Sequence, residues 1–501
     1  MTLLSKYVID CLAGDQRHAH PDFPFRLVTL LIFGVCVTAP APGYTPKPPP
    51  DPEAPPPDGP HLLNLRYDEN YSFLDDKPEA RGDDPLMKLK NIRLSDAWRL
   101  DIGGEFRLRA EFRENPTFGL DRRTANAQQN YRWMLHANVK YHDLFRLFAQ
   151  GVFAHVEDQD GPFQPTQENH GDVHQLFADL RILGRETPLT LRLGRQEFSY
   201  GNDRVVGPLD WVSTRRRFDA IKLLYDGGIF DAALFYARPV TVRRTRLDPW
   251  NDDYNLYGVY TTYKGVPNHG LDVYALISDH NEETRSPNRK SGALSLYTLG
   301  TRFWGRSAGF DYDTELAGQW GRWAGDNVAA WMWEIDGGYT FKHPWKPRIG
   351  AGFSYTSGDH DPFDGKVNTF NQLFTFNDVC IGILDLIGRQ NLTRGYVTVD
   401  LWPIPDKLMV AVYLHRYWLS AAEDAYYNAG AVPILRDLYG SSGVELGTEL
   451  DLWIEWHLNR HASVAVGYSH FWDDNYVHTR VGTVTGDDDP NLLLLQFRYR
   501  F

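Results

Sequence analysis

The sequence is poor in cysteine and methionine and has almost no long apolar run. Its 501 residues include three cysteines and five methionines. Cys11 and Cys36 lie near the N-terminus, which leaves at most Cys380 in a mature chain. Neither a disulfide framework nor a cysteine-based zinc site is therefore expected. The mean hydropathy of −0.44 excludes a helical membrane protein with several spans, but not a membrane barrel, whose strands are only half apolar.

A dominant basic patch is also missing. The formal net charge is −13, which argues against nucleic acid as a partner and fits acidic loops over a large surface. The chain is instead rich in aromatic residues (14%) and contains 43 glycines, a composition that favours sheet and turn over helix bundles. These features predict an all-β protein.

From about residue 100 the sequence becomes a series of segments in which apolar and polar residues alternate, each followed by a turn. This period of two predicts β-strands. We expect eighteen of them, near 101–114, 130–141, 144–156, 172–183, 189–198, 216–226, 229–238, 253–264, 271–280, 292–304, 308–320, 328–342, 347–357, 392–402, 408–419, 446–458, 462–473 and 490–501.

The connections between these segments are sorted by length. Joins after the even-numbered strands are short, such as "HD" and "GG", whereas most joins after the odd-numbered strands are long, up to roughly thirty residues at 358–391. The short join at 322–327 is an exception. An even strand count with short turns at one end and long loops at the other indicates a single antiparallel transmembrane β-barrel with periplasmic turns and extracellular loops.

The alternation also places charge on the inside of this barrel. In "GEFRLRAEFRE", Phe106 and Leu108 share one face while Arg107 and Arg109 share the other. Segments of this length, with tryptophan and tyrosine near their ends, fit lipid outside and water inside. Arg195 is out of phase with Arg192, which a bulge or an exit from the membrane would explain.

The N-terminal part has a different composition. Residues 1–43 read as a leader with a signal peptide, because Arg26 precedes an apolar run of about a dozen residues that ends in small residues and prolines. An N-terminal anchor helix is the alternative. Residues 44–60 form a proline-rich linker, 61–100 a periplasmic lead-in, and 101–501 the barrel.

Several motifs resemble the alginate-export outer-membrane proteins. They are "LRLGRQEFSYGNDRVVG" (191–207), "YTSGDHDPFDGKVNTFNQLF" (355–374), "GILDLIGRQNL" (382–392), "GTELDL" (447–452) and the closing "QFRYRF". The resemblance covers most of 62–501. It implies an eighteen-stranded, monomeric barrel that exports an anionic, uronate-type polysaccharide through a charged lumen, with a periplasmic export partner and outer-membrane lipid around it.

The candidate path for a polyanion is a set of arginines on the inward face. Guanidinium suits carboxylate because its planar fork makes two parallel hydrogen bonds. The set comprises Arg107, Arg109, Arg113, Arg132, Arg146, Arg181, Arg192, Arg394, Arg498 and Arg500. Acidic residues expected on the same face are Glu105, Glu111, Asp179, Glu449, Asp451 and Glu455. A structural lattice of ion pairs in any water-filled porin is the alternative interpretation.

Two further groups of residues are candidates for function. Asp359, Asp361 and Asp364 lie in the long loop 358–391, which we expect to act as a gate or plug; their oxygens would suit Ca²⁺, although an acidic turn explains the spacing better. His415, Ser469, His470 and Asp473 lie on late strands, but no hydrolase motif accompanies them, so we expect no enzyme and no cofactor. An uptake porin for small anions or sugars, and a barrel enzyme or glycan-binding adhesin, are the competing functions.

Overall fold

The computed structural model describes residues 62–118, 120, 125–157, 163–183, 188–377, 381–482 and 489–501. The predicted leader (1–43) and proline-rich linker (44–60) lie outside the described residues. Within the described part of the chain, no helix is both long and apolar enough to cross a membrane.

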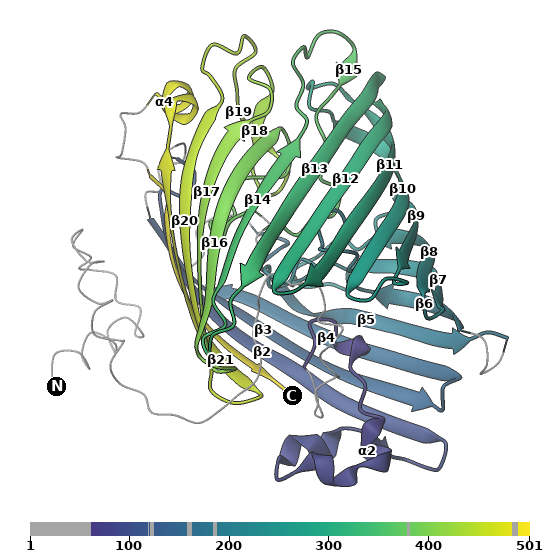
Figure 1. Ribbon diagram of the computed structural model, residues 1–501. Helices are drawn as coiled ribbons and strands as arrows, with labels where there is room; N and C mark the ends of the chain where they lie inside the picture. The colour runs from purple at the N-terminus through teal and green to yellow at the C-terminus, as the bar shows by residue number, and fades with distance from the viewer. Residues whose placement is uncertain are drawn as a thin grey trace. The chain divides into compact units, whose positions relative to one another are not determined.

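Eighteen antiparallel strands form a closed barrel (Figure 1). They are β2 (Trp98–Glu114), β3 (Ala125–Tyr141), β4 (Phe145–Glu157), β5 (Asn169–Arg181), β6 (Leu189–Gln196), β7 (Phe218–Asp226), β8 (Phe230–Pro239), β9 (Tyr254–Tyr263), β10 (His269–Arg285), β11 (Ser291–Ser307), β12 (Phe310–Trp323), β13 (Asp326–Thr340), β14 (Arg348–Thr356), β16 (Leu392–Ile404), β17 (Leu408–Leu419), β20 (Glu445–His457), β21 (Ala462–Asp473) and β22 (Asn491–Arg500). Each predicted strand corresponds to one of these, so the predicted fold is confirmed.

The first and last strands close the barrel. β2 pairs with β22 from Glu105↔Arg500 to Glu114↔Asn491, and β2 also pairs with β3. Closure leaves no unpaired strand edge, which a bilayer requires because it offers the backbone no hydrogen-bonding partner.

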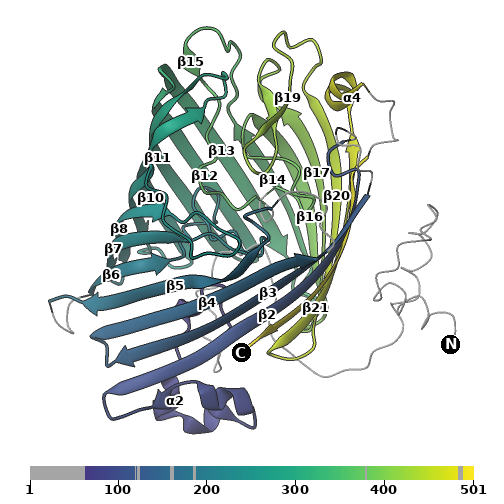
Figure 2. The same ribbon diagram turned by 180° about the vertical axis from the view of Figure 1, so that it is seen from behind.

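The loops are sorted as the sequence indicates (Figure 2). We number the long ones in chain order and use four: L2 (described over 163–168), L3 (197–217), L4 (240–253) and L7 (described over 357–377 and 381–391). The longest loops carry short elements of their own: β15 (Lys366–Val367), β18 (Ala425–Tyr427), β19 (Pro433–Arg436) and α4 (Asn475–Val481). The exceptional short join is confirmed as well, because only two residues separate β12 from β13.

Burial follows the alternation. On β3, Trp133 and Leu135 are 53% and 61% exposed, whereas Arg132 and Met134, on the opposite face, are buried. An apolar face turned outward suits lipid. Arg195 pairs with Asp219 at 2.8 Å (Nε to Oδ1), and both share the outward parity of Leu193 and Ile221. The strand therefore keeps its alternation at Arg195, and this residue lies where β6 ends.

The lead-in folds against the periplasmic end of the barrel. It contains η2 (Arg66–Asp68), α2 (Phe73–Asp76), η3 (Pro78–Arg81), η4 (Pro85–Leu89) and β1 (Ile92–Arg93). Arg66 donates hydrogen bonds to the carbonyl oxygens of Gly104 (2.9 Å) and Phe501 (2.7 Å), where the first and last strands meet. The Tyr67 ring packs on Phe148 and Phe177. The lead-in is thus tied to the closing seam and reaches into the lumen.

Inside the barrel, loops replace much of the water expected from the sequence. Ile381, Leu384 and Leu386 of L7 pack with the inward-facing Leu492 and Leu494 of β22 in one buried apolar cluster. A second cluster combines residues of L3, L7 and the opposite wall. The lumen therefore contains packed hydrophobic cores as well as charges.

Candidate functional site: the charged lumen

Three buried arginines hold L3 against the wall through its main chain. Arg107 donates to the carbonyl oxygens of Asp210 (2.8 Å) and Trp211 (2.9 Å). Arg109 donates to the Trp211 carbonyl at 2.9 Å, and its guanidinium lies 4.2 Å from the centre of the indole ring. Arg132 donates to the Asp210 carbonyl at 2.9 Å. The two strands thus present a cationic surface that is covered by a loop.

The Asp210 carboxylate is the acidic centre of this region. Arg132 and Arg215 pair with it at 2.7 and 2.6 Å, and Arg498 lies 3.7 Å away. Arg132 also pairs with Glu105 of β2, and Arg215 with Glu197 of L3. Buried charges are costly unless each is paired. Here Arg132 joins the wall to Asp210 of the loop, and further partners come from the wall for Arg132 and from L3 itself for Arg215.

A second cluster lies nearer the periplasmic end. Asp179 accepts hydrogen bonds from Arg192 (Nε to Oδ1, 2.7 Å) and from Arg146 (Nε to Oδ2, 2.9 Å). The Arg192 guanidinium lies 4.7 Å from the ring centre of Tyr67 and 4.3 Å from that of Phe177. The lead-in therefore covers these arginines from the periplasmic side, and Tyr67 makes a cation–π contact with Arg192.

L7 enters the lumen and binds predicted residues on both sides of the seam between β2 and β22. Arg113 donates to the Leu384 carbonyl at 2.9 Å. The Leu384 amide donates to Glu449 (3.1 Å), and the Ile383 amide donates to Asp451 (3.1 Å). The predicted acidic residues of β20 thus bind main-chain N–H groups of the loop.

L3 and L7 also bind each other. The Gly207 amide donates to the Phe374 carbonyl at 2.9 Å, and the Phe374 amide donates to the Val205 carbonyl at 3.0 Å. The Phe376 amide donates to the Asp203 carbonyl at 3.0 Å. The two loops therefore form one hydrogen-bonded body within the barrel.

The remaining predicted residues are more dispersed. Arg394 donates to Ser354 at 3.0 Å and stacks on Tyr396, while Glu455 is buried beside Trp453. Arg500 reaches the Leu62 carbonyl at 3.4 Å. Arg181 is the last residue of β5, at the periplasmic end, half-buried. Of the predicted acids, Glu111 pairs with Arg109 and Arg113 at 2.7 and 2.9 Å.

The three aspartates of L7 organise the loop itself. Asp359 accepts from the Asp361 amide, Asp361 from the Phe363 amide and Asp364 from the Lys366 amide. Such contacts are those of turn-forming side chains. The carboxylates are engaged in the turns that the sequence favoured; binding of Ca²⁺ by them stays a prediction.

A family model described as "Alginate export" matches residues 98–488, which is most of the chain. The chain belongs to the alginate export family. No curated protein matches the sequence. Among solved structures, the chain resembles OccK3 (OpdO) of Pseudomonas aeruginosa, with 10% identity, a TM-score of 0.52 and coverage of 80% of this chain and 96% of the other.

Two further solved structures show the same fold. OccAB3 of Acinetobacter baumannii matches with 10% identity and a TM-score of 0.54, over 80% of this chain and 100% of the other. OpdQ of Pseudomonas aeruginosa matches with 13% identity and a TM-score of 0.52, over 81% and 99%. This member of the alginate export family is an outer-membrane, porin-like barrel, and family and fold together support a channel.

Sequence reasoning missed the largest ionic cluster of this alginate export protein. Arg204 of L3 contacts four acids of β12 and β13: Asp313 at 2.6 Å, Glu315 at 3.3 Å, Glu334 at 2.9 Å, and Asp336. Alternation in "DYDTEL" and "WEID" puts these acids on the inward face, so a signal for the acidic wall existed. Arg204 lies in a loop without periodicity, so the sequence contains no signal that it contacts this acidic wall.

A cavity of about 500 Å³ opens near the extracellular ends of the strands. Its lining includes Arg285, Arg289 and Arg436 together with Trp323 and Tyr427. Arg285 and Arg289 are exposed, whereas Arg436 pairs with Asp424. Cations beside aromatic rings are groups that carbohydrate acids contact readily.

The residues considered for hydrolysis do not assemble into one site. Ser469 donates to Asp451, and His415 lies 3.3 Å from the same carboxylate. His470 instead contacts Asn491 at 2.7 Å, and Asp473 contacts His478. A nucleophilic serine needs its hydroxyl on a base that a third group orients. The family and the fold are those of channels.

Proposed function

We propose that this protein is a monomeric outer-membrane channel that exports an anionic, uronate-type polysaccharide from a periplasmic delivery partner. The observation that carries the proposal is the pair of hydrogen-bond acceptors that Arg107 of β2 finds in L3. Both acceptors of Arg107 are main-chain carbonyl oxygens of L3, which are neutral. A carboxylate makes stronger, charge-assisted hydrogen bonds to the same guanidinium. A passing uronate is therefore a competent replacement for the loop.

The positions of L3 and L7 determine how a uronate carboxylate can replace the loop carbonyls. L3 and L7 fill the lumen and bind each other, so a polymer passes only after they withdraw. Withdrawal uncovers Arg107, Arg109 and Arg113, which lie on one strand at intervals of two or four residues. Several weak sites in series hold a polyanion without trapping it. L3 and L7 are thus proposed as the gate, and the arginines beneath them as the path.

Recording from planar bilayers tests the proposal. Wild-type openings should favour anions and be blocked by a polyuronate, but not by a neutral polysaccharide of the same length. Block by small anions or neutral sugars alone would instead support an uptake porin. An unselective, unblocked pore would refute the export function.

A variant pair tests the role of the arginines. Arg107→Gln should reduce the preference for anions and weaken the block by polyuronate about tenfold, because a charge-assisted contact is lost. Arg416→Gln is the matched control, since Arg416 has outward parity on β17 and pairs with Asp474. Equal behaviour of the two variants would show that Arg107 is only structural.

A further inference from the structure

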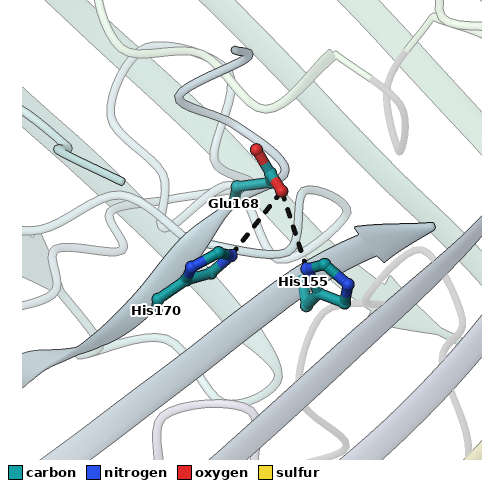
Figure 3. A group of neighbouring side chains, drawn as sticks. All are labelled: His155, Glu168 and His170. Carbon is teal, nitrogen blue, oxygen red and sulfur yellow. Dashed lines mark ion pairs between the residues drawn. The ribbon is translucent and has the colours of Figure 1, made fainter. Parts of the chain in front are cut away.

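Among the described residues, one group of histidine and acidic side chains has the spacing of a metal site (Figure 3). It comprises His155 of β4, Glu168 of L2 and His170 of β5. Glu168 Oε1 lies 3.6 Å from His155 Nδ1 and 3.6 Å from His170 Nε2. All ligand atoms lie within 4.8 Å of one another. Figure 3 shows the carboxylate between the two imidazole rings.

The group lies outside the proposed transport path. On β4, His155 shares the outward parity of Phe153, which is 41% exposed, and it comes two residues before the extracellular end of the strand. The side chains of His155 and His170 are 35% and 29% exposed, whereas Glu168 is almost fully buried. The two imidazole rings are therefore partly open to solvent, although His155 Nδ1 itself is covered, and the carboxylate has a fixed position.

The local bonding leaves a place for a cation. His155 Nδ1 is buried and has no hydrogen-bond partner, which is costly for a ring nitrogen. At 3.6 Å, both imidazole contacts to Glu168 are too long for hydrogen bonds. Ligand bonds of about 2.0–2.2 Å around tetrahedral Zn²⁺ place ligand atoms roughly 3.4 Å apart. A small closure of these side chains would complete such a site.

We propose that His155, Glu168 and His170 bind a divalent transition metal of the Zn²⁺ class at the outer rim of the barrel. Two imidazole nitrogens and one carboxylate oxygen suit Zn²⁺, Ni²⁺ and Cu²⁺, whereas Mg²⁺ and Ca²⁺ prefer oxygen ligands throughout. Three protein ligands leave a fourth position open to water.

Arg244 of L4 competes with the metal. Its guanidinium contacts both oxygens of Glu168, at 3.0 Å (Nε to Oε2) and 3.1 Å (Nη2 to Oε1). This contact neutralises the carboxylate, and the hydrogen bond from Nη2 uses one of the lone pairs of Oε1 that a metal would need. Metal binding displaces Nη2 from Oε1, so Arg244 sets the affinity of the site without being a ligand.

The site is connected to the loop that fills the lumen. Two residues before Glu168, the Thr166 carbonyl accepts hydrogen bonds from the amides of Ser213 (2.9 Å) and Thr214 (3.2 Å), both in L3. Thr214 Oγ1 also donates to the Pro165 carbonyl at 2.9 Å. A metal that fixes Glu168 to β4 and β5 therefore fixes the segment on which L3 rests. This consequence for gating depends on the proposed function, whereas metal binding does not.

Calorimetric titration of Zn²⁺ into the detergent-solubilised, metal-free barrel, prepared without a polyhistidine tag, tests the site. The wild type should bind one ion more tightly than surface histidines do. Loss of a residue that only hydrogen-bonds to a metal ligand lowers metal affinity about 10- to 100-fold. His155→Ala and His170→Ala each remove a ligand, so each should lower Zn²⁺ affinity by at least this factor. His360→Ala is the matched control, because His360 is 70% exposed and pairs with Glu423 outside this group.

The competing arginine gives a second test. Arg244→Gln should tighten Zn²⁺ binding several-fold, a gain that a damaged fold would not produce. Absorption of the Co²⁺-loaded protein should show a tetrahedral spectrum that His155→Ala abolishes. Unchanged affinity in both histidine variants, or no site above the background of the His155→Ala/His170→Ala double variant, would overturn the proposal.

Bilayer recording then separates the site from its consequence. If metal binding restrains L3, micromolar Zn²⁺ should reduce the frequency of openings in wild type but not in His170→Ala. Calorimetric binding without a change in gating would confirm the metal site and contradict the coupling. Polyuronate block is scored separately, so failure of the export function leaves the metal result intact.

Discussion

At the scale of single residues, the lumen is organised around charges that lie on loops. Asp210 of L3 pairs with Arg132 and Arg215, and Arg498 lies 3.7 Å away. Asp248 of L4 likewise pairs with Arg217. The Arg132 pair joins L3 to the wall strand β3, the Arg215 pair lies within L3, and the Arg217 pair joins L3 to L4. These pairs therefore hold the loops in place as well as neutralising buried charges. Single substitutions should therefore affect stability and gating together.

Asp210→Asn should destabilise the barrel. Removal of the carboxylate leaves Arg132 and Arg215 with one charged partner fewer, and breaking a buried pair costs roughly 3 kcal/mol. Urea unfolding in lipid vesicles, followed by tryptophan fluorescence, should show this loss together with more frequent openings in bilayers. Asp252→Asn is the control, because Asp252 is 78% exposed and pairs with Arg238; its cost should stay below about 1 kcal/mol. Equal costs for both variants would contradict the role given to Asp210.

The inward orientation of residues such as Arg107 and Glu105 could be predicted from the sequence, since a strand has a fixed period of two. Their partners could not be predicted. Asp210 and Arg204 lie in L3, where no period relates sequence position to direction, and they meet the wall only through the folding of that loop. Sequence pattern therefore does not distinguish arginines that form structural ion pairs from arginines that line a transport path. Arg132, one of the residues proposed for the path, forms ion pairs with Glu105 and Asp210.

At the scale of elements, the lead-in carries a titratable contact. Lys90 Nζ donates to the Ile102 carbonyl at 2.9 Å, and burial lowers the pKa of Lys90 to about 8. The charged amine is disfavoured in the docked segment, so docking is weakest below pH 8. It should strengthen as pH rises from 8 towards the ordinary lysine value of 10.5 and then level off.

Limited proteolysis should reveal this dependence. Trypsin cleavage within the lead-in should slow about tenfold between pH 8 and pH 9.5, after correction with a peptide substrate, because one unit of pKa corresponds to about 1.4 kcal/mol. Lys90→Met keeps the buried volume and removes the titration. Its cleavage rate should not change with pH, and a pH effect that persists in this variant would assign it to another group.

The L7 loop approaches the wall closely at Gly382. A Cβ atom on this residue would lie 2.6 Å from Oε1 of Glu449, the oxygen that accepts the Leu384 amide. Gly382→Val should push this part of L7 away from β20 and increase the open probability of the channel several-fold in bilayers. Gly318→Val is the control, since nothing lies within 4 Å of its added Cβ. A silent Gly382→Val would show that L7 does not close the lumen.

The strands were the predictable elements and the loop folds were not. Each strand is specified locally by alternation and by the turn that ends it, as in the two-residue join between β12 and β13. The inward course of L7 depends on contacts distant in sequence, such as Ile383 with Asp451. "GILDLIG" contains apolar residues that need burial, but its sequence does not say which surface buries them.

At the scale of the whole molecule, the gate should act as one unit. L3 and L7 bind different side chains of the wall, and three main-chain hydrogen bonds also join the two loops to each other at Phe374 and Phe376. If one loop withdraws, the other loses these hydrogen bonds and part of a shared apolar cluster. Opening is therefore expected to be cooperative, with both loops leaving together, rather than a sum of two independent movements.

A double-mutant cycle on the open probability measures this cooperation. Asp210→Asn loosens L3 and Gly382→Val loosens L7; in a joint gate their combined effect should differ from the sum by at least about 0.5 kcal/mol. Gly382→Val combined with Arg416→Gln, on the outward face, should be additive within about 0.3–0.5 kcal/mol. Additivity in the first pair would mean that the loops open separately, and the lumen would then have two gates in series.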